Sequence, residues 1–464
     1  MKHLIAITAA LLLLTGCSGV KNLTKPNIET PENWGSEAPI DTLTIADLGW
    51  WEFYGDSNLL NLIQRALENN KRLGITAARI EQARYLYKVD KSKLLPELSF
   101  VLPWNNETND YYEETRLRDP EIGVKATISW EADLWGSLTW GKRKSYAQFL
   151  ATLENERAMR MTLVAEVATA YFRLVALDNE LRIVRNSMAT RQEGVRLAKL
   201  RYEGGVTSET VYLQAQVQYA TAAALIPNLE YNIEVAENAI AILLGELPGL
   251  RIERSSDLSD NTLPVSIPMG LPSMLLERRP DVMASEYQLK AAVANVGATY
   301  ANRFPRLVLT FTGGWEDNDF KNLFRSPFSY IAETFTAPLF DFGRRKNNYK
   351  ASIAAYEEAR LNYEQKVLTA FQEVENAFSH YNQARQAVVL DNELQEAAFK
   401  YQYLTWKQWR GGTINYIDVL DAQRRYLEAR IALANAKRDE HLALIDLYKA
   451  LGGGWTIEQQ SPNE

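Results

Sequence analysis

The sequence predicts a mainly α-helical fold with a smaller β part, built from two copies of one αβ unit. Three observations indicate this fold class. The two halves of the chain match each other, each half carries segments in which apolar and polar residues alternate, and two long stretches contain no proline and almost no glycine. Strict alternation is typical of strands, whereas long uninterrupted stretches favour helices.

Composition excludes several classes of function. The chain has 464 residues and a mean hydropathy of −0.28, which is the average of a water-soluble protein. Its 51 Lys and Arg residues against 58 Asp and Glu residues give a formal net charge of −7, which argues against a nucleic-acid partner. Three histidines and one cysteine, Cys17, cannot build a Cys/His metal site or a Cys/His nucleophile pair. We therefore expect that the protein is not an enzyme and that it binds no metal and no cofactor.

The N-terminus is typical of an exported lipoprotein. Residues 1–16 read as a signal peptide, whose apolar run from Leu4 to Leu14 is too short to span a bilayer as a helix. The run ends in Leu14-Thr15-Gly16-Cys17, which resembles a bacterial lipobox, so we expect a covalent lipid on Cys17. The alternative is a buried cysteine. Ser18 favours the outer membrane, and residues 17–55 are predicted to be a lipid-anchored tether.

Internal duplication sets the domain organisation. Gly204-Gly205 aligns with Gly411-Gly412, and the same shift carries Trp135-Gly136 onto Phe342-Gly343. We predict a first repeat over 56–255, a linker over 256–270, a second repeat over 271–455 and a tail over 456–464. Each repeat should run as helices, two strands and a long helical hairpin. The helix before the first strands is expected from about Thr76 to Leu94.

Two strands are expected in each half, near 97–131 and near 306–339. Ile122 to Glu131 alternates strictly, and Phe328 to Leu339 supplies the last strand. These strands are either hairpins packed on a helical core or membrane-spanning strands of about 9–11 residues, and their length and terminal tryptophans favour the second. Four strands cannot close a barrel, for which about eight are needed, so several chains would have to share one barrel.

Long helices follow the strands. Lys142 to Glu203 contains one glycine, Gly194, and Arg344 to Arg410 contains none, which indicates a coiled coil or a helical tube. The last helix carries two stripes of mostly apolar residues, so it should pack on both sides. One stripe comprises Leu427, Ile431, Ala434, Arg438, His441, Ile445 and Tyr448, and the other comprises Leu433, Ala436, Glu440, Ala443, Leu447 and Ala450. Each glycine pair is expected to stop a helix at the tip of a helical hairpin.

Several motifs, in the order in which they occur along the chain, resemble those of the TolC-type outer membrane factors, in their lipoprotein branch. The resemblance covers nearly the whole mature chain and is carried by Gly49-Trp50-Trp51-Glu52-Phe53-Tyr54-Gly55-Asp56, Asp133-Leu134-Trp135-Gly136, Arg278-Arg279-Pro280-Asp281-Val282, Asp418-Val419-Leu420-Asp421-Ala422 and Ala450-Leu451-Gly452-Gly453-Gly454-Trp455. It implies a homotrimer, with a twelve-stranded transmembrane β-barrel continuous with a twelve-helix periplasmic α-barrel. It also implies a passive exit channel of a tripartite efflux pump, partnered by a periplasmic adaptor and an inner-membrane transporter.

The resemblance places the functional residues. Asp418 and Asp421 are three apart, share a helix face and correspond to the acids of the family's channel constriction. The alternative is a solvated acidic face. The tyrosine and arginine that latch the entrance in TolC-like proteins fall on Trp409 and Ile414, so the sequence departs from the family's latch, and Arg410 is a candidate substitute. Candidates for adaptor docking at the hairpin tips are Arg201, Tyr202, Gly204, Gly205, Arg410, Gly411 and Gly412. The expected bend between barrel and tube is assigned to Pro96, Gly136, Pro305 and Gly343.

Two rival interpretations share the lipobox and the helix content. One is a surface lipoprotein that binds a nutrient, and the duplicated alternating strands argue against it. The other is a periplasmic coiled-coil scaffold or a lipoprotein enzyme acting on peptidoglycan, against which the two-sided helices and the missing catalytic constellation argue.

Overall fold

The computed structural model describes residues 23, 25–26, 28–31, 34, 44–109, 117–256 and 267–455. The expected signal peptide, Cys17, most of the expected linker and the tail lie outside these residues. Two compact units emerge, and each draws on both halves of the sequence. Unit 1 comprises Met1–Ile28, Ala78–Glu154 and Val282–Lys366, and unit 2 comprises Glu29–Ala77, Asn155–Asp281 and Val367–Glu464.

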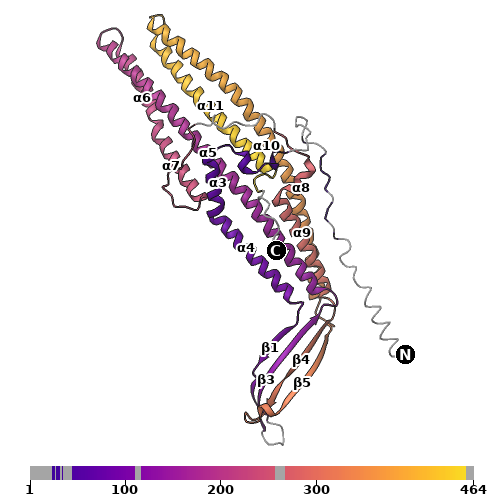
Figure 1. Cartoon of the computed structure of the whole chain (residues 1–464). Helices are drawn as coiled ribbons and strands as arrows, with labels where there is room; N and C mark the ends of the chain where they lie inside the picture. The colour runs from indigo at the N-terminus through magenta and orange to yellow at the C-terminus, as the bar shows by residue number, and fades with distance from the viewer. Residues whose placement is uncertain are drawn as a thin grey trace. The chain divides into compact units, whose positions relative to one another are not determined.

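Helices dominate the described residues (Figure 1). The elements, in chain order, are η1 (Ile45–Asp47), α2 (Trp50–Phe53), α3 (Ser57–Asn69), α4 (Lys71–Ser92), β1 (Glu97–Val101), β2 (Trp104–Asn109), β3 (Leu117–Ala132), α5 (Ser137–Glu203), α6 (Glu209–Ala223), α7 (Leu225–Leu243), η3 (Pro272–Met274), α8 (Leu275–Arg278), α9 (Pro280–Ala301), β4 (Arg306–Asp317), η4 (Leu323–Arg325), β5 (Pro327–Thr336), α10 (Arg344–Arg410) and α11 (Tyr416–Ala450). Within the described residues, no helix combines the length and the apolar character needed to cross a membrane.

The described residues of unit 1 form one antiparallel sheet in the order β1-β3-β4-β5 (Figure 1). β2 also pairs with β3. β1 and β2 form one interrupted strand, because both follow the same register along β3, from Glu97 opposite Ser129 to Trp104 opposite Ile122. Pro103 lies at the interruption, where it has no N–H to donate, although its carbonyl still accepts from the Gly123 N–H at 3.0 Å. The sheet therefore has four strand positions, as the sequence predicts.

The two faces of this sheet differ in polarity. The register sets Leu98 beside Ile128, Ile128 beside Phe311, and Phe311 beside Ile331, and these side chains are 71%, 43%, 45% and 73% exposed in strand order. On the opposite face Lys125 forms ion pairs with Glu121 at 2.7 Å and Glu316 at 2.8 Å. Alternation along each strand produces this separation, which confirms the predicted alternation.

Helix–strand junctions in unit 1 are held by side chains that reach across them. The Trp135 indole donates to the Pro305 carbonyl at 2.7 Å, and its ring stacks on Phe304 at 4.8 Å between centroids. The Asp133 carboxylate accepts from the backbone N–H groups of Leu138 and Thr139 at the start of α5. The aspartate–leucine–tryptophan–glycine motif thus starts α5 and ties that start to the connection between α9 and β4.

The core of unit 2 lies where α3 and α7 pack against α5. Buried residues of α3 such as Leu59 and Ile63 belong to one apolar cluster with Val167 and Leu174 of α5 and Ile240 of α7. α11 is buried along both predicted stripes, since His441 and Tyr448 on one stripe and Ala443 and Leu447 on the other are inaccessible. The two-sided packing of this helix is therefore confirmed.

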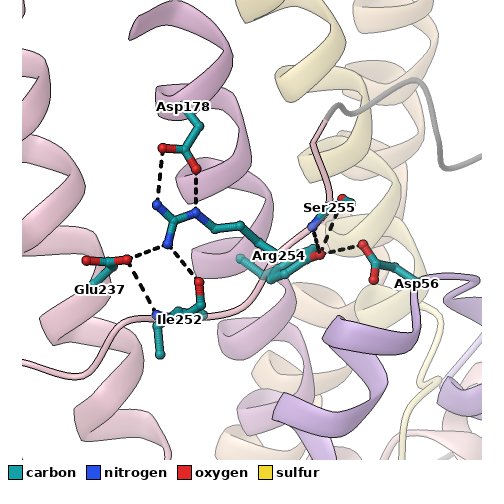
Figure 2. Close-up of polar contacts among 7 residues, drawn as sticks. Asp56, Asp178, Glu237, Ile252, Arg254 and Ser255 are labelled. Carbon is teal, nitrogen blue, oxygen red and sulfur yellow. Dashed lines mark hydrogen bonds and ion pairs between the residues drawn. The ribbon is translucent and has the colours of Figure 1, made fainter. Parts of the chain in front are cut away.

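The segment after α7 is tied down by a network of polar side chains (Figure 2). Arg254 pairs with Asp178 of α5 and Glu237 of α7 and donates to the Ile252 carbonyl at 2.8 Å. Nearby, the Tyr171 hydroxyl donates to Asp56 and accepts from the Ser255 N–H at 3.0 Å. Burial and the hydrogen bond to Asp56 raise the pKa of Tyr171 to about 12.

The terminal motifs of the sequence meet in unit 2. The ring of Phe53 stacks on Tyr448 at 4.0 Å, and the Tyr448 hydroxyl donates to the Leu48 carbonyl at 2.7 Å. Arg279 is buried and forms ion pairs with Asp281 at 2.8 Å and with Glu373 of α10 at 2.5 Å. Trp455 donates to the Arg278 carbonyl at 3.0 Å. These motifs therefore serve packing.

Several predicted boundaries are wrong in detail. α4 begins at Lys71 rather than Thr76, and β3 covers 16 residues rather than the ten from Ile122 to Glu131. β5 ends at Thr336 rather than Leu339. The larger difference lies after the first glycine pair, where the expected single helix is divided at Ala224 into α6 and α7. Pro227 explains the break, because it has no N–H to continue the helical hydrogen bonds.

Candidate functional site: the helical hairpin tips

Both hairpin tips in unit 2 have the same local structure. At the first tip the Val206 N–H donates to the Arg201 carbonyl at 2.8 Å, and the Gly205 N–H donates to the Tyr202 carbonyl at 2.9 Å. At the second tip the Thr413 and Gly412 N–H groups make the equivalent bonds to Gln408 and Trp409, both at 3.0 Å. This Schellman pattern ends a helix on a left-handed residue. Gly205 and Gly412 supply it, with φ of 71° and 76°, which confirms the predicted helix stops.

Arg201 and Trp409 join the two hairpins near their tips. The Arg201 guanidinium of α5 lies 4.8 Å from the ring centroid of Trp409 on α10, and that ring lies 4.9 Å from Tyr416 on α11. Beneath them an apolar cluster includes Ala198, Ala215, Tyr416, Val419 and Leu420, with Ile414 and Trp409 packed against it. Burial raises the pKa of Tyr416. The two positions of the family's latch thus take part in apolar and cation–π contacts.

The other predicted tip residues make contacts within their own hairpin. Tyr202 stacks on Tyr212 of α6 with ring centroids 6.2 Å apart. Arg410 lies over the ring of Trp406, one turn earlier in α10, at 4.6 Å. The structure therefore brings Arg201 to the opposite hairpin, whereas Tyr202 and Arg410 stay with their neighbours.

Asp418 and Asp421 both lie in the first two turns of α11, but their surroundings differ. The Asp418 carboxylate accepts from the Asn415 N–H at 3.2 Å, so it caps the start of the helix. The Asp421 carboxylate accepts from Arg425 at 2.7 Å and Arg424 at 2.8 Å. These two guanidinium groups hold the pKa of Asp421 below its ordinary value. Two cations, Arg424 and Arg425, therefore lie beside the second of the two acids.

Comparison with known proteins identifies the family. The family model described as outer membrane efflux protein matches residues 62–246 and 271–453. The chain belongs to the outer membrane efflux protein family. It is 29% identical over 462 residues to the solvent efflux pump outer membrane protein SrpC of Pseudomonas putida, covering 97% of this chain and 98% of that protein. It is 30% identical over 465 residues to the outer membrane protein OprJ of Pseudomonas aeruginosa, covering 98% and 97%.

Solved structures agree with this assignment. The outer-membrane channel OprN has a TM-score of 0.86 and 27% identity to this chain, covering 93% of this chain and 99% of that one. The fold predicted from the sequence is confirmed as that of the TolC-type outer membrane factors, and the chain is an outer membrane efflux protein. Its helices and strands build a channel component of the outer membrane.

The remaining predicted residues of the efflux protein have defined places in unit 1 or lie outside the described residues. Each of the four residues assigned to the bend is at a junction between a helix and a strand: Pro96 precedes β1, Gly136 precedes α5, Pro305 precedes β4 and Gly343 precedes α10. Their role in bending the chain stays a prediction. Cys17 lies outside the described residues.

Sequence reasoning missed three features of the efflux protein's tip region. Arg424 and Arg425, three and four residues after Asp421, could have been found from helical spacing alone. Gly194 lies against Tyr416, where an added Cβ would be 2.6 Å from the hydroxyl oxygen. Arg191 is buried although it is charged. The last two depend on contacts between distant segments, so no local pattern indicates them.

Proposed function

We propose that three copies of the chain form a passive exit channel of a tripartite efflux pump. Each copy contributes four strand positions to a twelve-stranded barrel in the outer membrane and four helical columns to a twelve-helix periplasmic tube. Substrates enter at the hairpin tips from an adaptor and an inner-membrane transporter and leave through the barrel without catalysis. The name of SrpC, a solvent efflux pump protein, supports small toxic molecules as the cargo.

The polarity of the unit 1 sheet carries this proposal. Its exposed apolar face suits lipid, and its polar face, with the Lys125 ion pairs, suits a water-filled lumen. The strand order has β1 and β5 at its two ends, and unpaired edges favour pairing with further strands. Four positions are fewer than the roughly eight that a closed barrel needs, so shared closure between copies follows.

Asp418 and Asp421 are proposed to line the entrance as a ring of six carboxylates in the trimer. Acidic rings favour cations in channels. The tips, with Arg201, Tyr202, Gly204, Gly205, Arg410, Gly411 and Gly412, are proposed to receive the adaptor. A lipid on Cys17 is proposed to anchor the N-terminus in the outer membrane, in addition to the barrel.

The decisive experiment is chemical crosslinking of full-length protein extracted from outer membranes in mild detergent. A trimer band that disappears when the protein is denatured before crosslinking is expected, together with ion conductance when the same sample is added to a planar bilayer. A crosslinked species no larger than the monomer, or a trimer without conductance, would contradict the shared channel. Bulky substitutions at Gly205 and Gly412 that leave pump assembly unchanged would argue against docking at the tips.

A further inference from the structure

Arg191 of α5 is a buried cation whose charge is incompletely compensated. Its side chain is 4% exposed, and Nη1 donates to the Gln218 carbonyl of α6 at 2.7 Å. The buried Nε has no hydrogen-bond partner among the described residues. Glu428, the acid whose charge acts on Arg191, instead pairs with Arg424 at 3.1 Å. An arginine stays protonated when buried, and a buried charge without a partner is strongly destabilising.

A pocket of about 80 Å³ adjoins this arginine between α5, α10 and α11. Space of this size holds more than one water-sized group. Arg191 and Arg430 line it with the hydroxyls of Ser187 and Tyr426 and the amide of Gln423. The Thr190 hydroxyl also lies in the lining, but it already donates to the Asn186 carbonyl at 3.1 Å. Leu427 is its one apolar lining residue, and no carboxylate belongs to the lining formed by the described residues.

The chemistry of this lining selects one class of ligand. Two guanidinium groups without a lining carboxylate repel cations, and the polar lining does not suit an apolar molecule. Hydroxyl, amide and guanidinium donors match an anion, which charge-assisted hydrogen bonds would hold. Water alone would satisfy the donors but would leave the charge of Arg191 uncompensated.

We propose that this pocket binds a small anion, a halide or an inorganic oxyanion, which pairs with Arg191. The anion joins Arg191 of the first hairpin to Arg430 of the second, behind the tips. Bound anion therefore stabilises the packing of the two hairpins. This inference does not depend on trimer formation or on the transported substrate.

Thermal unfolding of the full-length protein in detergent tests the proposal at constant pH and ionic strength. Chloride and phosphate are compared with gluconate, which is too large for the pocket. We expect a saturable rise in Tm of about 2 °C or more in chloride or phosphate. The rise should vanish in Arg191→Met and persist in Arg196→Met, because Arg196 is an exposed arginine of the same helix that pairs with Glu193 at 2.6 Å.

Crystals of the unaltered protein soaked in bromide provide a readout that needs no variant. An anomalous peak beside Arg191 together with a chloride effect identifies a halide site. A phosphate-specific rise in Tm, with phosphate density in the pocket, identifies an oxyanion site. Water alone in the pocket under both conditions, with equal Tm values in the three salts, overturns the proposal.

Discussion

The hydroxyl of Tyr416 on α11 occupies the space that the absent side chain of Gly194 leaves on α5. A Cβ at position 194 would lie 2.6 Å from the hydroxyl oxygen, whereas the ring carbon that carries this hydroxyl is 4.0 Å away. The contact joins the two hairpins of unit 2 beside the cluster of Ala198, Val419 and Leu420. Glycine at this point of a long helix is thus a requirement of packing between helices.

Gly194→Ala should therefore destabilise the protein, although alanine is the better helix former. Overpacking costs about 1–3 kcal/mol, against a gain in helix propensity of about 1 kcal/mol. Thermal and denaturant unfolding would measure the difference. Gly74→Ala in α4 is the matched control, because nothing lies within 4 Å of its added Cβ, and it should be neutral or stabilising. Tyr416→Phe should restore the loss in the double variant, and a failure to do so would contradict the assigned contact.

The Arg201–Trp409 contact should oppose separation of the hairpins. Cation–π pairs contribute about 0.5–2 kcal/mol, so Trp409→Leu should raise the ratio of open to closed channels by about 2- to 30-fold. Single-channel recording would measure the open fraction. Arg410→Ala is the control, because Arg410 contacts Trp406 of its own helix. Equal open fractions in Trp409→Leu and Arg410→Ala would contradict the proposal that the contact between Arg201 and Trp409 holds the two hairpins together.

The arginines beside Asp421 should weaken the cation preference of the proposed entrance. Arg424→Gln with Arg425→Gln removes the guanidinium groups that hydrogen-bond this carboxylate. We expect a stronger preference for cations, and we expect the pKa of Asp421 to return upward toward its ordinary value. Reversal potentials in salt gradients would measure the first effect.

Asp418→Ala with Asp421→Ala tests the ring itself. Cation preference should fall and conductance should change, because the proposed entrance loses its acids. Asp418→Asn with Asp421→Asn separates charge from structure, since an amide oxygen can still accept from the Asn415 N–H. Conductance and selectivity that match the unaltered protein in both double variants would eliminate the ring.

Tyr171 makes the stability of unit 2 depend on pH in the alkaline range. Its pKa of about 12 in the folded protein exceeds the value of about 10 for an unfolded tyrosine. The folded state therefore holds this proton more tightly, so the stabilisation is complete below pH 10 and is lost as the pH rises toward 12. At neutral pH Tyr171→Phe should cost about 1.5–3 kcal/mol, because it removes the hydrogen bond to the Asp56 carboxylate.

The difference in stability between the unaltered protein and Tyr171→Phe should disappear as the pH rises from about 10 to about 12. Unfolding curves at a series of pH values would measure it. Tyr85→Phe, which alters an exposed tyrosine of α4, controls for general effects of alkali. A gap that stays constant from pH 9 to pH 12, roughly the window set by the two pKa values, would contradict the assignment.

Cys17 is the single cysteine of the chain, which makes lipid attachment simple to test. Cys17→Ser should abolish incorporation of labelled palmitate and leave the protein in outer-membrane fractions, because the proposed barrel would hold it there without the lipid. Label that persists in the variant would place the lipid elsewhere. Loss of the variant from the membrane would show instead that the barrel is an insufficient anchor.

Local patterns explain what the sequence predicts correctly. The glycine pairs at 204–205 and 411–412 determine helix ends by their own backbone freedom, and alternation along β3 and β4 determines which side chains share a face. Pro227, another local signal, accounts for the division of α6 from α7. The position that corresponds to Pro227 in the second repeat is Ala434, which lies inside an unbroken α11.

Contacts between segments distant in sequence explain the rest. Arg201 meets Trp409, and Gly194 meets Tyr416, across more than two hundred residues. No periodic pattern in the sequence indicates either contact. Likewise, the buried position of Arg191 follows from packing between helices, which a single sequence does not reveal.

Pro103 has a consequence for the seam at which another copy would join the sheet. Its carbonyl accepts from Gly123 of β3, so its missing donor belongs to the inner ladder. Backbone groups alternate in direction along an antiparallel strand, so those of the adjacent Leu102 and Trp104 point away from β3. The proline therefore weakens one rung inside a single chain and keeps the donors of Leu102 and Trp104 on the side where another copy would pair. Closure of the proposed barrel would thus leave the most fragile point of this strand within one subunit.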